Sequence, residues 1–286
     1  MVLLGAHVSI RGGLHKSFDE AEKLGINAFQ IFTRNPRGWK FKELDEKQVL
    51  KFKQRTKESK INQVISHMPY LPNLCAPEKT IFEKSVDSLK AELHRSGILE
   101  IPYVVIHIGH HKGNAEIGWK RFTNALEQAF EVIPKNVMLL VENSAGEKNS
   151  IGNTPEELKR ILDAAENVGG DKHNFGFCFD TCHAHVSGLD LSTPESFAEV
   201  LDKFDEEIGL DRIKVVHLND AKAPAGSGLD RHENIGDGTI GLESFKFFLN
   251  ETKLAKRVPL ILETPIKQGG KTHKDDLKIL RSIIKK

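Results

Sequence analysis

Six short apolar runs of the sequence carry an imidazole or a carboxylate at their last position or next to it. These residues are His67, His107, Glu142, Asp180, His217 and Glu263. If the runs are buried strands, any one of these side chains could simply be a hydrogen-bonded polar residue at a strand end. Six that converge on one place favour a metal site instead. Three imidazoles with three carboxylates suit zinc best, and manganese or iron less well.

Two further segments offer ligands of the same kinds. The segment CFDTCHAH places His183 three residues after Asp180, in the loop that we expect above the strand. The segment GLDRHENIGDG places Asp230 and His232 two residues apart, so both face the same way in an extended chain. His183, Asp230 and His232 would make a site with three protein ligands and open positions, as catalytic zinc sites have. The nine candidate ligands can serve three metals if Glu142 bridges two of them.

The composition excludes several classes of protein. The 3 cysteines are a sparse, odd count that argues for a reducing compartment, and CFDTC lacks the C-x-x-C spacing, so we expect Cys178 and Cys182 to be bystanders. Lys and Arg number 41 against 40 Asp and Glu, so no field of the whole molecule attracts nucleic acid or membrane. No run approaches the roughly 20 apolar residues of a membrane span, so we expect a cytoplasmic protein without a membrane partner.

The elements that must position these residues alternate along the chain. We predict eight strands, at Leu3–His7, Ala28–Phe32, Gln63–His67, Tyr103–His107, Val137–Glu142, Phe175–Asp180, Ile213–Leu218 and Pro259–Glu263. Helical patterns lie between them: one stops at Gly97, and others begin at Thr154 and Thr193, each followed by proline. Eight such units of roughly 30 to 40 residues are typical of an α/β fold, the (β/α)8 TIM barrel, here as one domain over residues 1–286. Active sites of these barrels lie at the C-terminal ends of the strands, which is where the six side chains stand.

Four runs carry a resemblance to a known family. FDTCHAHVSG, GLDRHENIGDGTIG, LVENSAG and GAHVS closely resemble endonuclease IV, a family of zinc-dependent apurinic/apyrimidinic (AP) endonucleases. The resemblance covers essentially the whole chain and implies a xylose-isomerase-like barrel with three zinc ions (Zn2+) at its mouth. It implies that the first zinc is held by His67, His107 and Glu142, the second by Glu142, Asp180, His217 and Glu263, and the third by His183, Asp230 and His232.

The activity that the resemblance implies is DNA repair by base excision. Such an enzyme hydrolyses the phosphodiester bond 5′ to an abasic site in double-stranded DNA and leaves a 3′-OH and a 5′-deoxyribose phosphate. A hydroxide held between the first two zincs would attack the phosphate, while the third zinc would stabilise the leaving oxygen. Glu142, as the bridging carboxylate, would be the catalytic residue that fixes the metal spacing and orients the nucleophile.

Two loops carry the expectations about DNA. FTRNPRGWK and MPYLPNL follow the second and third predicted strands, and they combine cations with aromatic and apolar residues, as contact with phosphates and unstacked bases requires. Alternatively, Tyr70 merely caps the barrel and the cations are solvated. The resemblance implies that Arg37, Tyr70 and Leu71 push into the base stack, so that the abasic nucleotide flips into the zinc site. We expect abasic DNA as the partner and a monomeric enzyme; His185 receives no role.

Fold alone does not decide between this function and two others. Sugar isomerases and epimerases with the same barrel use one or two divalent metals on a small sugar. They have no need of a third site at Asp230 and His232, nor of loops such as those with Arg37 and Tyr70. A non-catalytic protein that binds DNA lesions would keep nine metal ligands without a reaction to perform.

Overall fold

Eight parallel strands close into a barrel in the part of the chain that the computed structural model describes, which is residues 2–40, 42–266 and 269–285. The strands are β1 (Leu3–His7), β2 (Ala28–Ile31), β3 (Gln63–His67), β4 (Tyr103–Ile106), β5 (Met138–Glu142), β6 (Phe175–Asp180), β7 (Ile213–His217) and β10 (Pro259–Leu262). Each strand pairs with its neighbours, and β10 closes the ring against β1. The predicted TIM barrel is confirmed, and each strand ends within one residue of its predicted end.

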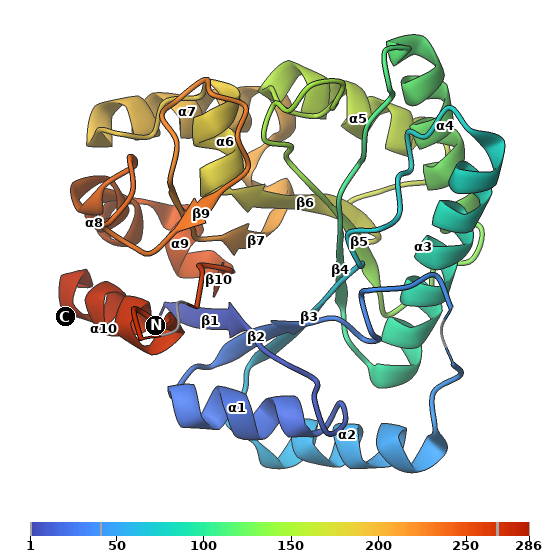
Figure 1. Ribbon diagram of the computed structural model, residues 1–286, viewed down its shortest axis with the longest axis horizontal. Helices are drawn as coiled ribbons and strands as arrows, with labels where there is room; N and C mark the ends of the chain where they lie inside the picture. Colours follow the sequence, from blue (N-terminus) through green and yellow to red (C-terminus); the bar gives the residue numbers. More distant parts are fainter. Residues whose placement is uncertain (1, 41, 267–268, 286) are drawn as a thin grey trace.

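Helices form an outer layer around the barrel (Figure 1). They are α1 (Lys16–Leu24), α2 (Glu46–Glu58), α3 (Lys79–Leu99), α4 (Ala115–Phe130), α5 (Pro155–Asn167), α6 (Thr181–Ser187), α7 (Pro194–Ile208), α8 (Leu242–Glu251), α9 (Lys253–Arg257) and α10 (His273–Ile283). The last helix returns to the start of the chain, where Arg281 donates to the carbonyl of Gly25 at 2.6 Å. Among the described residues, no helix combines the length and the apolar character that crossing a bilayer would require.

Two apolar cores hold the layers together. The larger lies between the strands and the helices and contains most of the buried phenylalanines, among them Phe175, Phe177 and Phe179 of β6. The smaller fills the inside of the barrel and consists of Ala28, Ile65, Val105, Leu140, Cys178, Val215 and Ile261. Because successive side chains of a strand point to opposite faces, both faces of each strand are buried, which explains the almost continuous apolar runs.

One predicted helix end is wrong. α3 continues past Gly97 to Leu99, and Glu100 is the residue in the left-handed conformation, with φ 59°. Gly97 is needed inside the helix for another reason, since a Cβ there would lie 2.6 Å from Cγ of Pro134. A close contact between two segments therefore explains this glycine.

Both predicted helix starts are confirmed. The Thr154 side chain accepts a hydrogen bond from the main-chain N–H of Glu157 at 3.2 Å, and Thr193 accepts one from Ser196 at 3.1 Å. In α7 the Ser196 side chain reaches back to Thr193 and completes a reciprocal capping box. In α5 the Glu157 carboxylate instead accepts from the main chain just before Thr154, so it tethers the preceding loop.

A two-stranded hairpin stands outside the barrel and was not predicted. β8 (Asp220–Ala221) pairs antiparallel with β9 (His232–Glu233), and the loop between them carries Asp230. Two-residue strands carry too little apolar pattern to be recognised in a sequence. The hairpin brings the second candidate segment to the end of the barrel where β7 ends.

Candidate metal centre

The alternation of the strands places the candidate ligands in one layer. In β5, Leu140 belongs to the inner core, and Glu142 follows two residues later on the same face. The same step leads from Ile65 to His67, from Val105 to His107, from Cys178 to Asp180, from Val215 to His217 and from Ile261 to Glu263. The inner core is thus an apolar floor, and the ligands form the next layer above it, at the mouth of the barrel.

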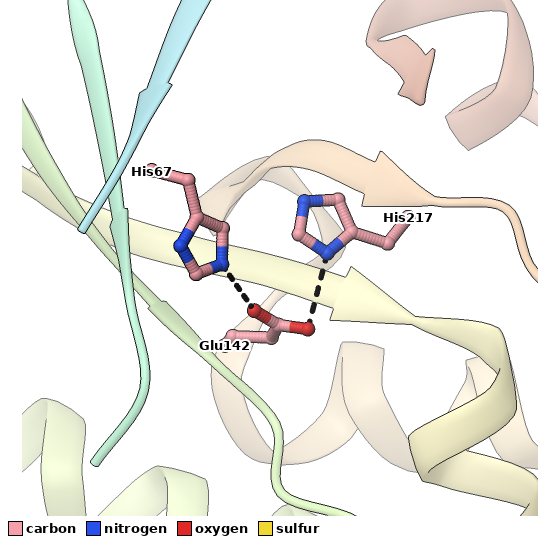
Figure 2. A group of neighbouring side chains, drawn as sticks. All are labelled: His67, Glu142 and His217. Atoms are coloured by element: carbon pink, nitrogen blue, oxygen red, sulfur yellow. Dashed lines mark hydrogen bonds and ion pairs between the residues drawn. The ribbon is translucent and has the colours of Figure 1, made fainter. Parts of the chain in front are cut away.

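Glu142 lies at the centre of this layer and is 1% exposed. Its Oε2 is 3.2 Å from Nε2 of His67 and 3.4 Å from Nε2 of His107. Its Oε1 is 3.0 Å from Nδ1 of His217 and 3.2 Å from Nδ1 of His183. Figure 2 shows the two oxygens of Glu142 directed at His67 on one side and at His217 on the other. Each oxygen therefore serves a different group of imidazoles, as a bridging carboxylate must.

The electrostatics of the centre keep Glu142 ionised. Burial opposes its charge, but His217 and His107 outweigh burial and hold the pKa of the Glu142 carboxyl well below its ordinary value. The pKa of His107 itself is lowered to about 4, chiefly because burial disfavours the imidazolium. A neutral imidazole beside an ionised carboxylate is the protonation state that metal coordination requires.

A second group gathers around His217. One ligand atom each from Glu142, Asp180, His217 and Glu263 lies within 4.8 Å of the others. Nδ1 of His217 is 3.2 Å from Oε2 of Glu263 and 3.8 Å from Oδ2 of Asp180. Three carboxylates around one ring nitrogen suit a divalent cation.

A third group gathers around Asp230. Its Oδ1 is 3.3 Å from Nε2 of His183 and 3.5 Å from Nε2 of His232, and the three ligand atoms lie within 4.8 Å of one another. Burial again opposes the charge, but the nearby imidazole of His183, and that of His232 after it, lower the pKa of Asp230 to about 2. The three residues come from α6, from the loop before β9 and from β9 itself.

The prediction that His183 lies in a loop is wrong, because the residue belongs to the short helix α6. The Asp180 side chain caps this helix by accepting a hydrogen bond from the main-chain N–H of His183 at 2.8 Å. Gly188 ends the helix in a left-handed conformation. One carboxylate of Asp180 thus both starts the helix and stands among the candidate ligands.

The hydrogen bonds of three imidazoles show which nitrogen faces the centre. A main-chain carbonyl can only accept, so the ring nitrogen beside it must donate. Nδ1 of His67 donates to Met68 at 2.6 Å, Nδ1 of His183 to Asn143 at 3.0 Å, and Nδ1 of His232 to Glu263 at 3.2 Å. When such a ring is neutral, its Nε2 has a lone pair, and in all three residues this atom lies within 3.5 Å of a carboxylate oxygen.

This arrangement fits a cation. Within the described residues, the buried Nε2 atoms of His183 and His232 have no hydrogen-bond partner. When the two rings are neutral, as metal coordination requires, their Nε2 lone pairs face the Asp230 carboxylate, and a cation between them would bind all three groups. The donor set of nitrogen and oxygen atoms suits zinc. Which residues hold which ion stays a prediction.

The segment after His232 is held by one buried carboxylate. The side chain of Asp220 accepts from the main-chain N–H groups of Ala221 at 2.8 Å, Gly236 at 2.9 Å, Ile240 at 3.0 Å and Gly238 at 3.1 Å. A Cβ at Gly238 would lie 2.4 Å from Oδ1 of Asp220, so only glycine allows the contact. The NIGDGTIG part of the motif therefore serves to anchor the hairpin that carries His232.

Five of the nine candidate ligands line two cavities that open at the mouth. One of about 460 Å³ is bounded by Tyr70, Leu71, His107, His183 and Asp230, together with Pro72, Asn73, Gly109, His110, Ser144, Ala145, Glu147 and Ser150. The other, of about 300 Å³, reaches His232 and Glu263. A larger cavity of about 920 Å³ lies near the two chain ends, beside β1, α8 and α10, and none of the candidate ligands lines it. The smaller cavities are therefore the candidate active site, because candidate ligands line them.

Known proteins resemble this chain in sequence and in structure. Residues 18–283 match the model of the xylose isomerase-like TIM barrel family. A protein of Methanoculleus marisnigri named probable endonuclease 4 is 48% identical over 268 residues, which cover 93% of each chain. The crystal structure of endonuclease IV from Thermus thermophilus superposes with a TM-score of 0.84 at 34% identity and covers 98% of both chains. The chain belongs to the endonuclease IV family.

A structure with lower sequence identity to this chain has the same barrel fold. A D-tagatose 3-epimerase-like protein superposes with a TM-score of 0.72 and covers 99% of this chain and 97% of its own. At 19% identity this likeness shows the fold alone.

Two of the three residues expected to contact DNA, Tyr70 and Leu71, line a cavity together with candidate metal ligands. Arg37 is exposed in the loop after β2, while Tyr70 and Leu71 follow β3 and are 61% and 43% exposed. The Tyr70 ring packs edge-on against Phe32 and His107, with centroids 5.3 and 5.6 Å apart. Exposed apolar side chains are thus fixed directly above the candidate ligands.

Cys182 and His185 also lie near the centre, although the sequence assigned neither of them a role there. Cys182, expected to be a bystander, lies with Asp180 and His232 in a group whose ligand atoms are within 4.8 Å of one another. Burial raises the pKa of the Cys182 thiol, which donates to the carbonyl of Arg231 at 3.6 Å. His185 is 1% exposed and contacts Thr239 and the N–H of Leu191, so it links α6 to the segment after the hairpin and to the loop after α6.

Gln30 is a buried residue of the centre that sequence reasoning missed. It follows Ala28 of the inner core by two residues and therefore lies in the ligand layer. Its amide contacts Glu263 at 2.7 Å and His217 at 2.9 Å. The signal was the polar residue inside the apolar run AFQIF, which the predicted strand end at Phe32 obscured.

Proposed function

We propose that this protein is an AP endonuclease of base excision repair. It hydrolyses the phosphodiester bond 5′ to an abasic site in double-stranded DNA and leaves a 3′-OH and a 5′-deoxyribose phosphate. The observation that carries this proposal is the gathering of nine imidazoles and carboxylates at the mouth of the barrel, where Tyr70 packs against His67 and His107. Membership of the endonuclease IV family supports it.

The proposed cofactor is zinc, with three ions per chain. The first is held by His67, His107 and Glu142, the second by Glu142, Asp180, His217 and Glu263, and the third by His183, Asp230 and His232. Zinc bound there would neutralise phosphate charge and would make water a competent nucleophile near neutral pH. The unpartnered Nε2 atoms of His183 and His232 support the third site most directly.

The groups of the proposed centre have different roles. Glu142 spaces the metals, because its two oxygens face different imidazoles. The main-chain carbonyls that accept from Nδ1 of His67, His183 and His232 keep those rings directed at the cavity. With water as the nucleophile, the reaction needs no covalent intermediate on a side chain, and the buried Cys182 stays a neutral thiol.

The proposed DNA-binding residues lie in the loops that follow β2 and β3. Arg37, Tyr70 and Leu71 would push into the base stack and fill the space that an extruded nucleotide leaves. The cavity of about 460 Å³ beside these residues would receive that nucleotide. Extrusion costs least where a base is already missing, which favours abasic sites over intact DNA. We further propose that residues 1–286 form one domain, which acts as a monomer in the cytoplasm.

Incision of a defined duplex tests this function. The duplex carries one tetrahydrofuran residue, an abasic analogue that cannot undergo β-elimination, and an undamaged duplex of the same sequence is the control. The zinc-loaded protein should nick only the damaged strand, 5′ to the analogue, and a DNA polymerase should extend the resulting 3′ end. If a zinc-loaded sample leaves both duplexes intact, the proposal is wrong, and isomerisation of small sugars becomes the reaction to assay.

A further inference from the structure

Gln30 connects three strands at the level of the candidate ligands. Its side chain is fully buried on β2, and its amide nitrogen donates to Oε1 of Glu263 on the β10 side at 2.7 Å. The same nitrogen contacts Nδ1 of His7 on β1 at 3.1 Å. Its amide oxygen lies 2.9 Å from Nε2 of His217 on β7. All of its hydrogen-bonding groups are thus used inside the barrel, and none points into the cavity above.

The partners of Gln30 fix the direction of every one of these hydrogen bonds. An ionised carboxylate can only accept, so the amide NH2 must face Glu263. The amide oxygen must then face His217, whose Nε2 has to carry the hydrogen. If the amide were reversed, two oxygen atoms would lie 2.7 Å apart without a proton between them.

The hydrogen on Nε2 determines the state of Nδ1, the other ring nitrogen of His217. With the hydrogen held on Nε2, the neutral ring has its lone pair on Nδ1. That atom is 3.0 Å from Glu142, 3.2 Å from Glu263 and 3.8 Å from Asp180, so it stands at the centre of the second group of ligands. The opposite tautomer would place a hydrogen where the metal has to bind.

Gln30 thereby does for His217 what the main chain does for other imidazoles of the centre. His67, His183 and His232 donate Nδ1–H to carbonyl groups and present Nε2. His217 donates Nε2–H to a side-chain amide and presents Nδ1. Because this acceptor is a side chain, its role can be removed without disturbing the backbone.

We propose that Gln30 is a positioning residue that holds His217 in its metal-binding tautomer and, through the same amide, orients the neighbouring ligand Glu263. It touches neither substrate nor the reacting atoms. This inference rests on the proposed zinc centre and assigns to it a side chain outside the nine candidate ligands. Groups that orient a metal-bound imidazole typically change metal affinity by about 10- to 100-fold when they are lost.

The test compares zinc-loaded wild-type protein with Gln30→Leu, which removes the amide at similar volume. The matched control is Gln63→Leu on the adjacent strand β3, because Gln63 stands at the opposite end of its strand and bonds only to the carbonyl of Val64. Nitrogen-15 NMR of the histidine rings identifies the protonated and the metal-bound nitrogen of His217, and the signals are assigned by their loss in a His217→Gln variant. Competition with a chelator measures how tightly each zinc equivalent is held.

The wild type should show a protected Nε2–H and a metal-bound Nδ1 at His217. Gln30→Leu should lose that protected hydrogen and should release one zinc equivalent about 10- to 100-fold more readily, while Gln63→Leu behaves as the wild type. If Gln30→Leu does not fold, Gln30→Asn, one methylene shorter, should show the same losses.

The inference would be overturned if Gln30→Leu showed unchanged His217 signals and unchanged zinc retention. The proposed function would still stand in that case, provided that the wild type nicks abasic DNA. A wild type that binds no zinc would instead overturn the proposed function. In that sample, the ring signals of His217 with and without the Gln30 amide still decide whether Gln30 orients the ring.

Discussion

At the scale of single residues, the chemistry depends on carboxylates that stay ionised although one is buried and the other half-buried. Glu142 and Asp230 stay charged because imidazoles surround them. Glu142 could be singled out from the sequence because an acid at the end of an apolar run is conspicuous, and Asp230 because it lies two residues from His232. Gln30 could not be found in this way, because an amide is no preferred zinc ligand and its role depends on which way its two ends point.

Replacing the central carboxylate should abolish incision. Glu142→Gln keeps the size of the side chain but removes the charge that faces four imidazoles, so zinc content should fall and incision should drop by about 100-fold or more. Circular dichroism should show an intact barrel. Glu251→Gln, on the far side of the barrel at α8, is the control and should incise as the wild type does. Full activity of Glu142→Gln would refute the bridging role.

Replacing the exposed aromatic ring should weaken binding of the lesion rather than of the metal. Stacking of one base on an aromatic side chain contributes about 1–3 kcal/mol, so Tyr70→Ala should bind abasic duplex roughly 5- to 150-fold more weakly at constant salt. Its zinc content should not change. Leu50→Ala removes an equally exposed apolar side chain from α2 and should bind normally. Undiminished affinity in Tyr70→Ala would show that the residue only caps the barrel.

At the scale of elements, the strands were predictable and the short pieces between them were not. Each strand is an apolar run between polar loops. Strand geometry alone places each candidate ligand on the same face as the inner-core residue two positions before it. α6 was taken for a loop because its start depends on the Asp180 side chain, which also counted as a ligand. The β8–β9 hairpin depends on the buried Asp220, whose partners are main-chain N–H groups and leave no residue pattern.

The hairpin anchor gives a prediction of its own. Asp220→Asn removes the charge that four main-chain N–H groups share, and an amide cannot accept from all of them, so the protein should lose about 1–3 kcal/mol of stability. Hydrogen exchange at Gly236, Gly238 and Ile240 should accelerate, and the zinc at His232 should be held less tightly. Asp202→Asn on the exposed side of α7 serves as the control. Unchanged exchange at these three amides would mean that the hairpin is held by other contacts.

At the scale of the whole molecule, the barrel converts positions scattered along the chain into one charged layer. Without metal, that layer consists of imidazoles and carboxylates that depend on one another. Burial opposes protonation of His183, but Asp180, Asp230 and Glu142 outweigh it and raise its pKa well above the ordinary value. The pKa of His217 is raised in the same way, against burial, by Cys178, Glu263 and Glu142.

These shifts predict how the stability of the zinc-free protein depends on pH. A raised imidazole pKa contributes stability below the unfolded value of about 6.5, and that contribution is lost as the pH rises through the folded pKa. A lowered carboxyl pKa contributes above its unfolded value, and at Asp230 the contribution is lost only as the pH falls through about 2. The zinc-free protein should therefore become less stable above neutral pH. Zinc should raise the melting temperature more at about pH 9 than at about pH 6, since protons compete for its ligands. A zinc effect that shrinks with rising pH would contradict this picture.

Stepwise addition of zinc to the metal-free protein tests the central claim most directly. Incision of the tetrahydrofuran duplex and bound zinc are measured on the same samples, with undamaged duplex beside them. A trinuclear centre predicts that incision 5′ to the analogue stays low until the third equivalent per chain has bound and then stops increasing. Full incision with one equivalent, or equal cleavage of undamaged DNA, would contradict a three-zinc centre specific for abasic sites.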